Sequence, residues 1–300
     1  MPPSTALRAR AESIFDRAEQ IYIGIMTKSG PHVTPDLFTV HDGQVWCMSA
    51  ATTLKSRRLV KDARAAVMAM AGGEAVIVAG EADVLDPARP SEIVGRSPLA
   101  AATAALGATK FVADNVAELS GAVTAALRGK LGDPVIPPHR VLISFDQHSV
   151  AVVGGGATEA EGWGTSGGGG TPGRDLDSAA TGDDEDDAAV PIPDGLVHGD
   201  RAVVGWVATD GRPLVLPAAW DAARSIATVD SALFEAVGGS VAGPACVTFD
   251  TWTGYGPLGK QGIMLRGQGS ASIASDGTDL KMTFERATYW DGITTETKRI

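Results

Sequence analysis

The chain has 300 residues, of which 44% are hydrophobic, and its 25 basic and 36 acidic residues give a net charge of −11. This size predicts two modest domains with adequate cores, and the acidic balance argues against a nucleic-acid binder, which would present a basic face. No apolar run approaches the roughly 18 residues needed to cross a membrane, and the N-terminus lacks an apolar signal-peptide core, so we expect a cytoplasmic protein.

The N-terminal third reads as one helix followed by short strands. Thr5–Gln20 has helical spacing behind a Ser4 or Thr5 N-cap. Ile21–Thr27 is an apolar, β-branched run ended by a Gly-Pro turn, and His32–Val40 alternates as the next strand. Asp42-Gly43 is a hairpin signal. After this hairpin we expect a strand over 44–49, a short helix over 52–61, and strands over 65–70 and 75–85, the last with a bulge at Gly80.

The passage from the 44–49 strand to the 52–61 helix predicts a phosphate site. A strand end followed at once by a helix N-terminus exposes backbone N–H groups and a positive dipole. The chain adds hydroxyl donors and cations there, namely Ser49, Thr52, Thr53, Lys55, Arg57 and Arg58. The alternative interpretation is a capped surface helix whose basic residues are solvated.

These motifs resemble the pyridoxamine 5′-phosphate oxidase-like split β-barrels, which bind FMN or the deazaflavin F420. The matching residues are Gly30-Pro31, Pro35, Asp42-Gly43, Thr53-x-Lys55-x-x-x-Leu59 and Asp62-x-Arg64. The resemblance, which covers roughly residues 10–85, implies that Lys55 and the hydroxyl before it hold the cofactor phosphate. It also implies backbone hydrogen bonds to the ring along His32–Pro35, which includes Val33. Leu54 stands where the oxidase itself has arginine, so the resemblance does not extend to the vitamin B6 reaction.

The rest of the chain predicts an insertion, a linker and a second copy of the first domain. We expect domain 1 over 1–153, with a helical insertion at 90–131 and a closing strand pair over Arg140–Val153. Residues 154–194 are rich in Gly and Asp and predict a disordered linker. Residues 195–300 repeat the first domain in degraded form: 205–217 echoes 24–35, 263–269 echoes 76–82, and 281–290 echoes 142–151.

The predicted fold class is therefore mainly β with helices (α+β), as two tandem split β-barrels that form an intrachain pseudo-dimer. Together with a composition rich in Ala, Gly and Val, this arrangement is typical of an actinobacterial protein. Family members dimerise with cofactors in grooves between subunits, so the resemblance implies such grooves within one chain. The expected counterpart of Lys55 in the second copy is Phe234-Glu235, where a carboxylate would repel a phosphate. We expect one competent groove per chain, and further oligomerisation stays open.

Other candidate residues lie in the second copy and along the barrel. Trp252, Tyr255 and Lys260 lie in a glycine-rich loop that would stack on a flavin ring and offer it a cation, or would pack on the barrel as an ordinary hairpin loop. His32 and His41 have no partner at catalytic or metal-ligand spacing, so we expect surface or structural histidines. Cys47 and Cys246 are expected to be buried free thiols. No metal motif or catalytic constellation is recognisable, and the catalytic residues stay unassigned.

The leading hypothesis is an FMN-dependent oxidoreductase that acts on a small organic substrate. F420 is the alternative cofactor, because both carry phosphate and one lysine does not choose between them. The rival from another class is a non-enzymatic haem- or flavin-binding protein of the same fold, and a third option is a scaffold without a cofactor.

Overall fold

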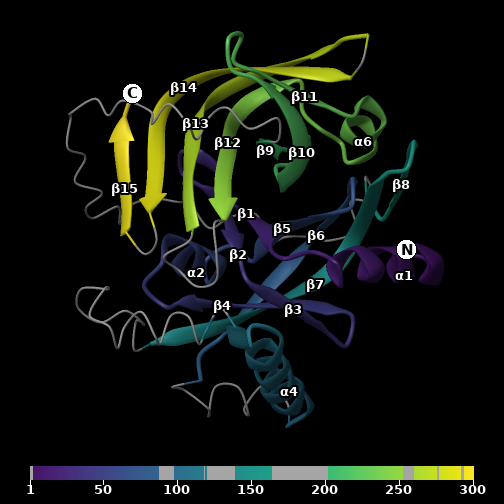
Figure 1. Cartoon of the computed structure of the whole chain (residues 1–300), viewed down its shortest axis with the longest axis vertical. Helices are drawn as coiled ribbons and strands as arrows, with labels where there is room; N and C mark the ends of the chain where they lie inside the picture. The colour runs from purple at the N-terminus through teal and green to yellow at the C-terminus, as the bar shows by residue number, and fades with distance from the viewer. Residues whose placement is uncertain are drawn as a thin grey trace.

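The computed structural model describes residues 3–87, 98–117, 119, 139–163, 202–252, 260–275, 277–291 and 294–300. Most of them lie in two curled β-sheets, an eight-stranded sheet in the first half and a seven-stranded sheet in the second, and these resemble split barrels. Figure 1 shows the first sheet in the lower half of the view and the second above it. The mainly β fold class predicted from the sequence is confirmed.

The first sheet holds β1 (Ile21–Thr27), β2 (Gly30–Asp36), β3 (Phe38–His41), β4 (Gln44–Ala50), β5 (Arg64–Ala71), β6 (Glu74–Leu85), β7 (Arg140–Gly154) and β8 (Ala157–Glu161). The second holds β9 (Ala202–Val207), β10 (Pro213–Asp221), β11 (Ile226–Val229), β12 (Ala242–Trp252), β13 (Lys260–Ile273), β14 (Thr278–Asp291) and β15 (Thr294–Arg299). The helices are α1 (Thr5–Phe15), α2 (Leu54–Leu59), α4 (Pro98–Asp114) and α6 (Ser231–Ala236).

Alternation along the strands divides the core between the two halves. In β6, Val76 and Val78 point into a core that also contains Ile14 and Phe15 of α1. Ile77, between those valines, points the other way and joins the core of the second sheet. Because successive side chains of a strand face opposite sides, one sheet can serve both cores. The core of the second half therefore includes residues of the first half, which also has a separate core of its own.

Several predicted boundaries are corrected. His32–Val40 is not one strand: β2 pairs with β1, and β3 pairs with β4 at the opposite end of the sheet. The helix that begins after the Ser4 cap ends at Phe15. Arg140–Val153 is a single strand, β7, not a pair. The bulge expected at Gly80 is confirmed, because the β6–β7 register shifts between Ala79 and Gly80. Within the expected insertion, α4 is described and most of the remainder lies outside the described residues.

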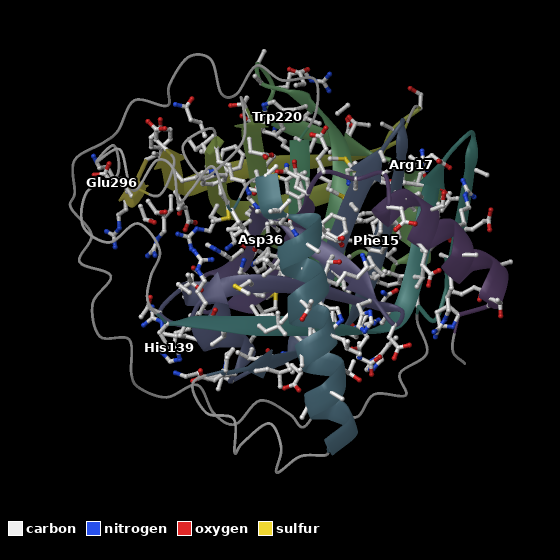
Figure 2. All side chains as sticks on the ribbon, turned by 60° about the horizontal axis from the view of Figure 1, so that its bottom comes forward. Phe15, Arg17, Asp36, His139, Trp220 and Glu296 are labelled. Carbon is white, nitrogen blue, oxygen red and sulfur yellow. The ribbon has the colours of Figure 1, made fainter. Side chains whose placement is uncertain are left out.

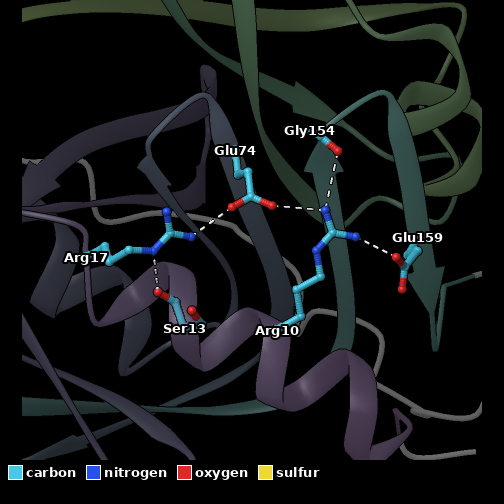
Figure 3. Close-up of polar contacts among 6 residues, drawn as sticks. All are labelled: Arg10, Ser13, Arg17, Glu74, Gly154 and Glu159. Carbon is cyan, nitrogen blue, oxygen red and sulfur yellow. Dashed lines mark hydrogen bonds and ion pairs between the residues drawn. The ribbon is translucent and has the colours of Figure 1, made fainter.

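The predicted linker begins too early in the sequence. Residues 157–161 form β8 on the edge of β7, whereas 164–201 lie outside the described residues. Figure 3 shows what fastens this edge: Arg10 of α1 contacts Glu159 of β8 at 2.5 Å and Glu74 of β6 at 3.0 Å. Arg17 contacts the other oxygen of Glu74 at 2.8 Å. Glu74 and Glu159 thus form ion pairs that attach α1 to this edge of the sheet.

The two sheets share one strand order. The first runs β2-β1-β5-β6-β7-β4, and the second runs β10-β9-β12-β13-β14 with β11 against β14. A glycine bulge occurs at the same place in each, at Gly80 of β6 and Gly267 of β13. A Cβ at either glycine would collide with a backbone oxygen, that of Asp146 or of Thr283. Thr283 therefore corresponds to Asp146, two residues away from the match that the 281–290 echo predicts.

The halves meet through reciprocal contacts of glycine and valine. Gly24 lies opposite Val33 in the β1–β2 hairpin, and Gly205 lies opposite Val215 in the β9–β10 hairpin. Across the halves the partners are exchanged: a Cβ on Gly24 would overlap Val215, and one on Gly205 would lie 2.6 Å from Cγ2 of Val33. Such an exchange of partners is the geometry of a two-fold interface. Only glycine lets these backbones approach so closely.

A polar cluster adds to this contact. The Tyr22 hydroxyl of β1 donates to Asp250 Oδ1 of β12 at 2.6 Å, and Gln20 Nε2 donates to Asp250 Oδ2 at 2.7 Å. Burial, followed by the nearby Asp250 charge, raises the pKa of Tyr22. Tyr22 therefore remains a neutral donor that ties the first sheet to the second.

We predict that Gly24→Ala destabilises the protein by about 1–3 kcal/mol, because the new methyl group overpacks against the stiff Val215 side chain. In a Val215→Ala background the same substitution is expected to cost less, since the colliding Cγ atom is gone. Urea unfolding of the four proteins of this cycle measures the coupling. Strictly additive effects would show that Gly24 and Val215 do not meet.

Candidate functional site

Basic residues from both halves are buried where β2 meets β12 and β13, a region called here the first junction. His32 of β2 is 9% exposed, Lys55 of α2 is 7% exposed and Arg266 of β13 is 8% exposed. Charged side chains are rarely buried this far, because removing an ion from water costs several kcal/mol. The first junction therefore contains buried ionisable side chains that an apolar core does not need.

Lys55 lies at the end of the first junction marked by Asp36, the last residue of β2. Its ammonium contacts Asp36 Oδ2, and Figure 2 labels Asp36 near the middle of the molecule. Burial lowers the pKa of Lys55 to about 7, and repulsion from Lys260 acts in the same direction. The Asp36 carboxylate opposes both by favouring the charged ammonium. Asp36 thus holds the Lys55 side chain in place, while burial and Lys260 weaken the affinity of the Lys55 amine for its proton.

His32 lies between Lys55 and Arg266 and stays neutral. Burial lowers the pKa of its imidazole to about 3, and the charges of Arg266 and Lys55 add to the effect. Its Nδ1 atom is buried and has no hydrogen-bond partner among the residues that the structure describes. An unsatisfied buried polar atom of this kind is rare in native proteins and requires an explanation.

Arg266 lies at the other end of the first junction, beside the β1–β2 turn. Its Nη1 donates to Ser29 Oγ at 3.4 Å, and its Nη2 donates to Thr288 Oγ1 of β14 at 3.2 Å. These hydroxyls, one from each half, orient the guanidinium plane. Arg266 and Lys55 therefore mark opposite ends of β2, with His32 between them.

The reciprocal region, where β10 meets β5 and β6, is called the second junction. The matching registers pair each polar residue of the first junction with a counterpart in the second. Every counterpart is apolar: Leu214 for His32, Ala218 for Asp36, Ala79 for Arg266 and Ala151 for Thr288. The same fold can therefore fill these positions without buried charge. The polar residues of the first junction are not required by the packing.

The counterpart of Lys55 follows from the helix caps. Thr53 accepts the N–H of Ser56 at the start of α2, and Asp230 accepts the N–H of Leu233 at the start of α6. Aligning the caps places Ala232 opposite Lys55. The expected match to Phe234-Glu235 is wrong, because counting back from the following strand ignores the longer Gly238-Gly239 connection. The conclusion that the second copy lacks this lysine stands, but repulsion by Glu235 is not the reason.

The hydroxyls predicted to hold phosphate are turned inward. Thr53 Oγ1 lies 3.1 Å from Ser49 Oγ and caps α2 through Ser56. Thr52 and Arg57 are exposed, and Arg58 is half-buried. With only six residues, α2 has a short dipole, and its first turn is already capped by protein. Of the predicted phosphate ligands, only Lys55 lies in the first junction.

The predicted ring-side residues differ in their placement. Val33 is fully buried; its N–H donates to Met264 Sδ at 3.3 Å and its C=O accepts from Thr248 Oγ1 at 3.0 Å. It is an interface residue whose backbone contacts the second half, and its predicted binding of a ring stays a prediction. Lys260 is close enough to Lys55 to lower its pKa. The side chain of Trp252 and the loop with Tyr255 lie outside the described residues.

Sequence reasoning missed Arg266 and expected His32 to be a surface or structural histidine. The available signal was the internal repeat, because an alignment of the two copies pairs His32 with Leu214 and Arg266 with Ala79.

Cys47 and Cys246 are buried free thiols, as expected. Within the described ranges, no helix is long and apolar enough to span a membrane. The same residues contain no group of three or more His, Cys, Asp or Glu placed to hold a metal ion.

No family model and no curated protein matches the chain. Among solved structures, it is similar to a NimC/NimA family protein from Clostridium acetobutylicum, with 15% identity, a TM-score of 0.32, and 52% of this chain and 91% of that one covered. It is also similar to a pyridoxamine 5′-phosphate oxidase-related, FMN-binding protein from Nostoc punctiforme, with 15% identity, a TM-score of 0.35, and 53% and 89% covered. A haem-binding protein from Mycobacterium smegmatis has 19% identity and a TM-score of 0.34, with 53% and 58% covered.

We predict that His32 makes the protein less stable in acid. The unfolded chain protonates this imidazole near pH 6.5, whereas the folded protein does so only near pH 3. Between these values the unfolded state binds more protons, so stability falls with falling pH, by at most about 1.4 kcal/mol per pH unit. Urea unfolding at several pH values measures the slope.

His32→Leu, which installs the residue of the second junction, should flatten that slope. His148→Leu, at a half-exposed surface histidine, is the matched control and should leave the slope as it is. Parallel curves for wild type and His32→Leu would contradict the placement of a neutral, buried His32.

Proposed function

We propose that the chain is an FMN-dependent oxidoreductase that binds one cofactor at the first junction and acts on a small organic substrate. The observation that carries the proposal is the asymmetry of the two junctions. Buried His32, Lys55 and Arg266 occupy positions that Leu214, Ala232 and Ala79 fill in the other half. Residues that cost stability and that the packing does not require are typical of a ligand site.

The basic character of these residues favours an anionic ligand. The Lys55 ammonium is a compact point charge, the form in which lysine binds phosphate. Lys260 from the second half adds positive charge beside it. In this proposal Lys55 and Lys260 hold the cofactor phosphate, and Asp36 positions the Lys55 side chain through their contact. A phosphate there would raise the pKa of Lys55, because a nearby anion favours the charged form.

His32 supplies a further feature of a ligand site in the proposal. It offers a buried neutral imidazole whose Nδ1 has no hydrogen-bond partner among the described residues, so a polar atom of a bound molecule would satisfy it. FMN supplies the hydride and electron transfer when bound, so this chain needs no acid–base constellation of its own. The residues present fit a phosphorylated flavin.

The reciprocal contacts support a second part of the proposal. Gly24 against Val215 and Gly205 against Val33 place the two halves as two subunits of a dimer would lie. We propose that the chain is an intrachain pseudo-dimer in which the first half grips the phosphate and the second forms the facing wall. The apolar second junction then gives one cofactor per chain.

The test is a titration of the cofactor-free chain with FMN, followed by quenching of flavin fluorescence. Lys55→Ala should weaken binding by about 10- to 150-fold, since a charge-assisted contact contributes roughly 1.5–3 kcal/mol. Ala232 occupies the corresponding helix position in the second half, so the variant should fold. Lys61→Ala, at an exposed lysine just beyond α2, is the matched control and should bind FMN as the wild type does.

Equal FMN affinity for wild type and Lys55→Ala would remove Lys55 from the site. The absorption spectrum of the purified chain separates the rivals. Flavin bands support the proposal, whereas a deazaflavin band or a haem Soret band would replace FMN with F420 or haem. A colourless chain that takes up none of the three would favour the scaffold.

A further inference from the structure

We infer that Arg266 and His32 form a second anion site within the first junction, which binds a carboxylate or similar oxoanion of the substrate. The inference deepens the proposed function, on which it rests for the assignment of the phosphate to Lys55. It names a chemical class for the substrate: a small organic anion rather than a neutral or cationic molecule.

Lys55 and Arg266 lie at separate ends of the first junction. Arg266 contacts Ser29, which immediately precedes β2, and Lys55 contacts Asp36, the last residue of β2. The seven residues of β2 span about 20 Å of extended backbone. His32 lies between the two ends and its imidazole feels both charges. One phosphate held at Lys55 therefore does not reach Arg266, which lies on the far side of His32.

The donors of Arg266 have a geometry that suits a carboxylate. A guanidinium presents five N–H donors in a planar fork that matches a carboxylate in two-point contact. The Arg266 plane is oriented from both halves, by Ser29 Oγ of the β1–β2 turn and by Thr288 Oγ1 of β14. Thr288 is itself 3.0 Å from Thr297 Oγ1 of β15, so a chain of hydroxyls supports the arginine. A pre-oriented fork loses little entropy when it binds an anion.

The buried His32 side chain offers a further donor. His32 is more than nine-tenths buried, and its Nδ1 has no hydrogen-bond partner among the described residues. A carboxylate beside Arg266 would accept a hydrogen bond from Nδ1–H of the neutral imidazole. The same anion would offset the Arg266 charge that disfavours protonation of His32. One ligand group thus satisfies both residues.

The second junction differs from the first at these positions. Arg266, His32 and Thr288 have Ala79, Leu214 and Ala151 as counterparts, and all three counterparts are fully or almost fully buried. The fold packs these positions with apolar side chains when no anion is to be bound. Replacement by the counterpart residue is therefore a substitution that this fold already accommodates.

The experiment is calorimetric titration of the full chain, saturated with FMN, with benzoate and acetate as probes and with benzamide as the neutral isostere of benzoate. Wild type should bind the carboxylates and not benzamide. Arg266→Ala should weaken carboxylate binding by about 10- to 150-fold, and His32→Leu should weaken it by a smaller factor. Lys281→Ala, at an exposed lysine of β14, is the control and should bind as wild type does.

A crossed comparison separates this inference from the proposed function. Arg266→Ala should lose carboxylate binding and keep FMN binding, and Lys55→Ala should lose FMN affinity and keep carboxylate binding in FMN-free protein. If both variants lose both ligands equally, the junction is one site and the inference is overturned while FMN binding stands. If wild type binds neither carboxylate, or binds benzamide equally well, the inference is also overturned. Carboxylate binding that depends on Arg266 in a chain that never binds FMN would support the anion site and refute the cofactor.

Discussion

The close approach of two hairpins governs the rest of this structure. Gly24 and Gly205 have no side chains, so Val215 and Val33 of the opposite halves can pack directly on their backbones. This contact turns the outer face of the first sheet into part of the core of the second, with Ile77 as a member. It also creates two junctions, because each hairpin faces a strand pair of the other half. Everything proposed about function depends on the difference between those junctions.

That difference is a matter of free energy. Both junctions are built from the same strand order and the same glycine bulges, so the demands of packing are alike. One is filled with Ala and Leu, and the other buries an arginine, a lysine and a histidine nitrogen that has no hydrogen-bond partner in the described part of the chain. Buried ions are costly, and replacing them by apolar residues is often neutral or stabilising. A ligand site explains why His32, Lys55 and Arg266 are present at one junction only. A purely structural role does not explain this difference.

The local features of the fold could be predicted from the sequence, and the site could be predicted only in part. The Asp42-Gly43 hairpin forms with both residues at positive φ, and Gly80 makes a bulge, because these effects are set by neighbouring residues. Lys55 is a phosphate ligand predicted from its motif, and the structure buries it in the first junction. Thr53 and Ser49 are also predicted phosphate ligands, but the structure places their hydroxyls in the cap of α2. Arg266 was missed because its importance depends on contact with residue 29, distant in the chain, and only the comparison of the two halves shows it.

The most direct test is native mass spectrometry of the purified full chain beside a variant in which His32→Leu, Lys55→Ala and Arg266→Ala install the residues of the second junction. The account predicts one flavin mass per wild-type chain and none on the variant, with both proteins folded by circular dichroism. Retention of the flavin by the variant would contradict the placement of the site at the first junction. Two flavins per wild-type chain would contradict the claim that the apolar second junction binds none.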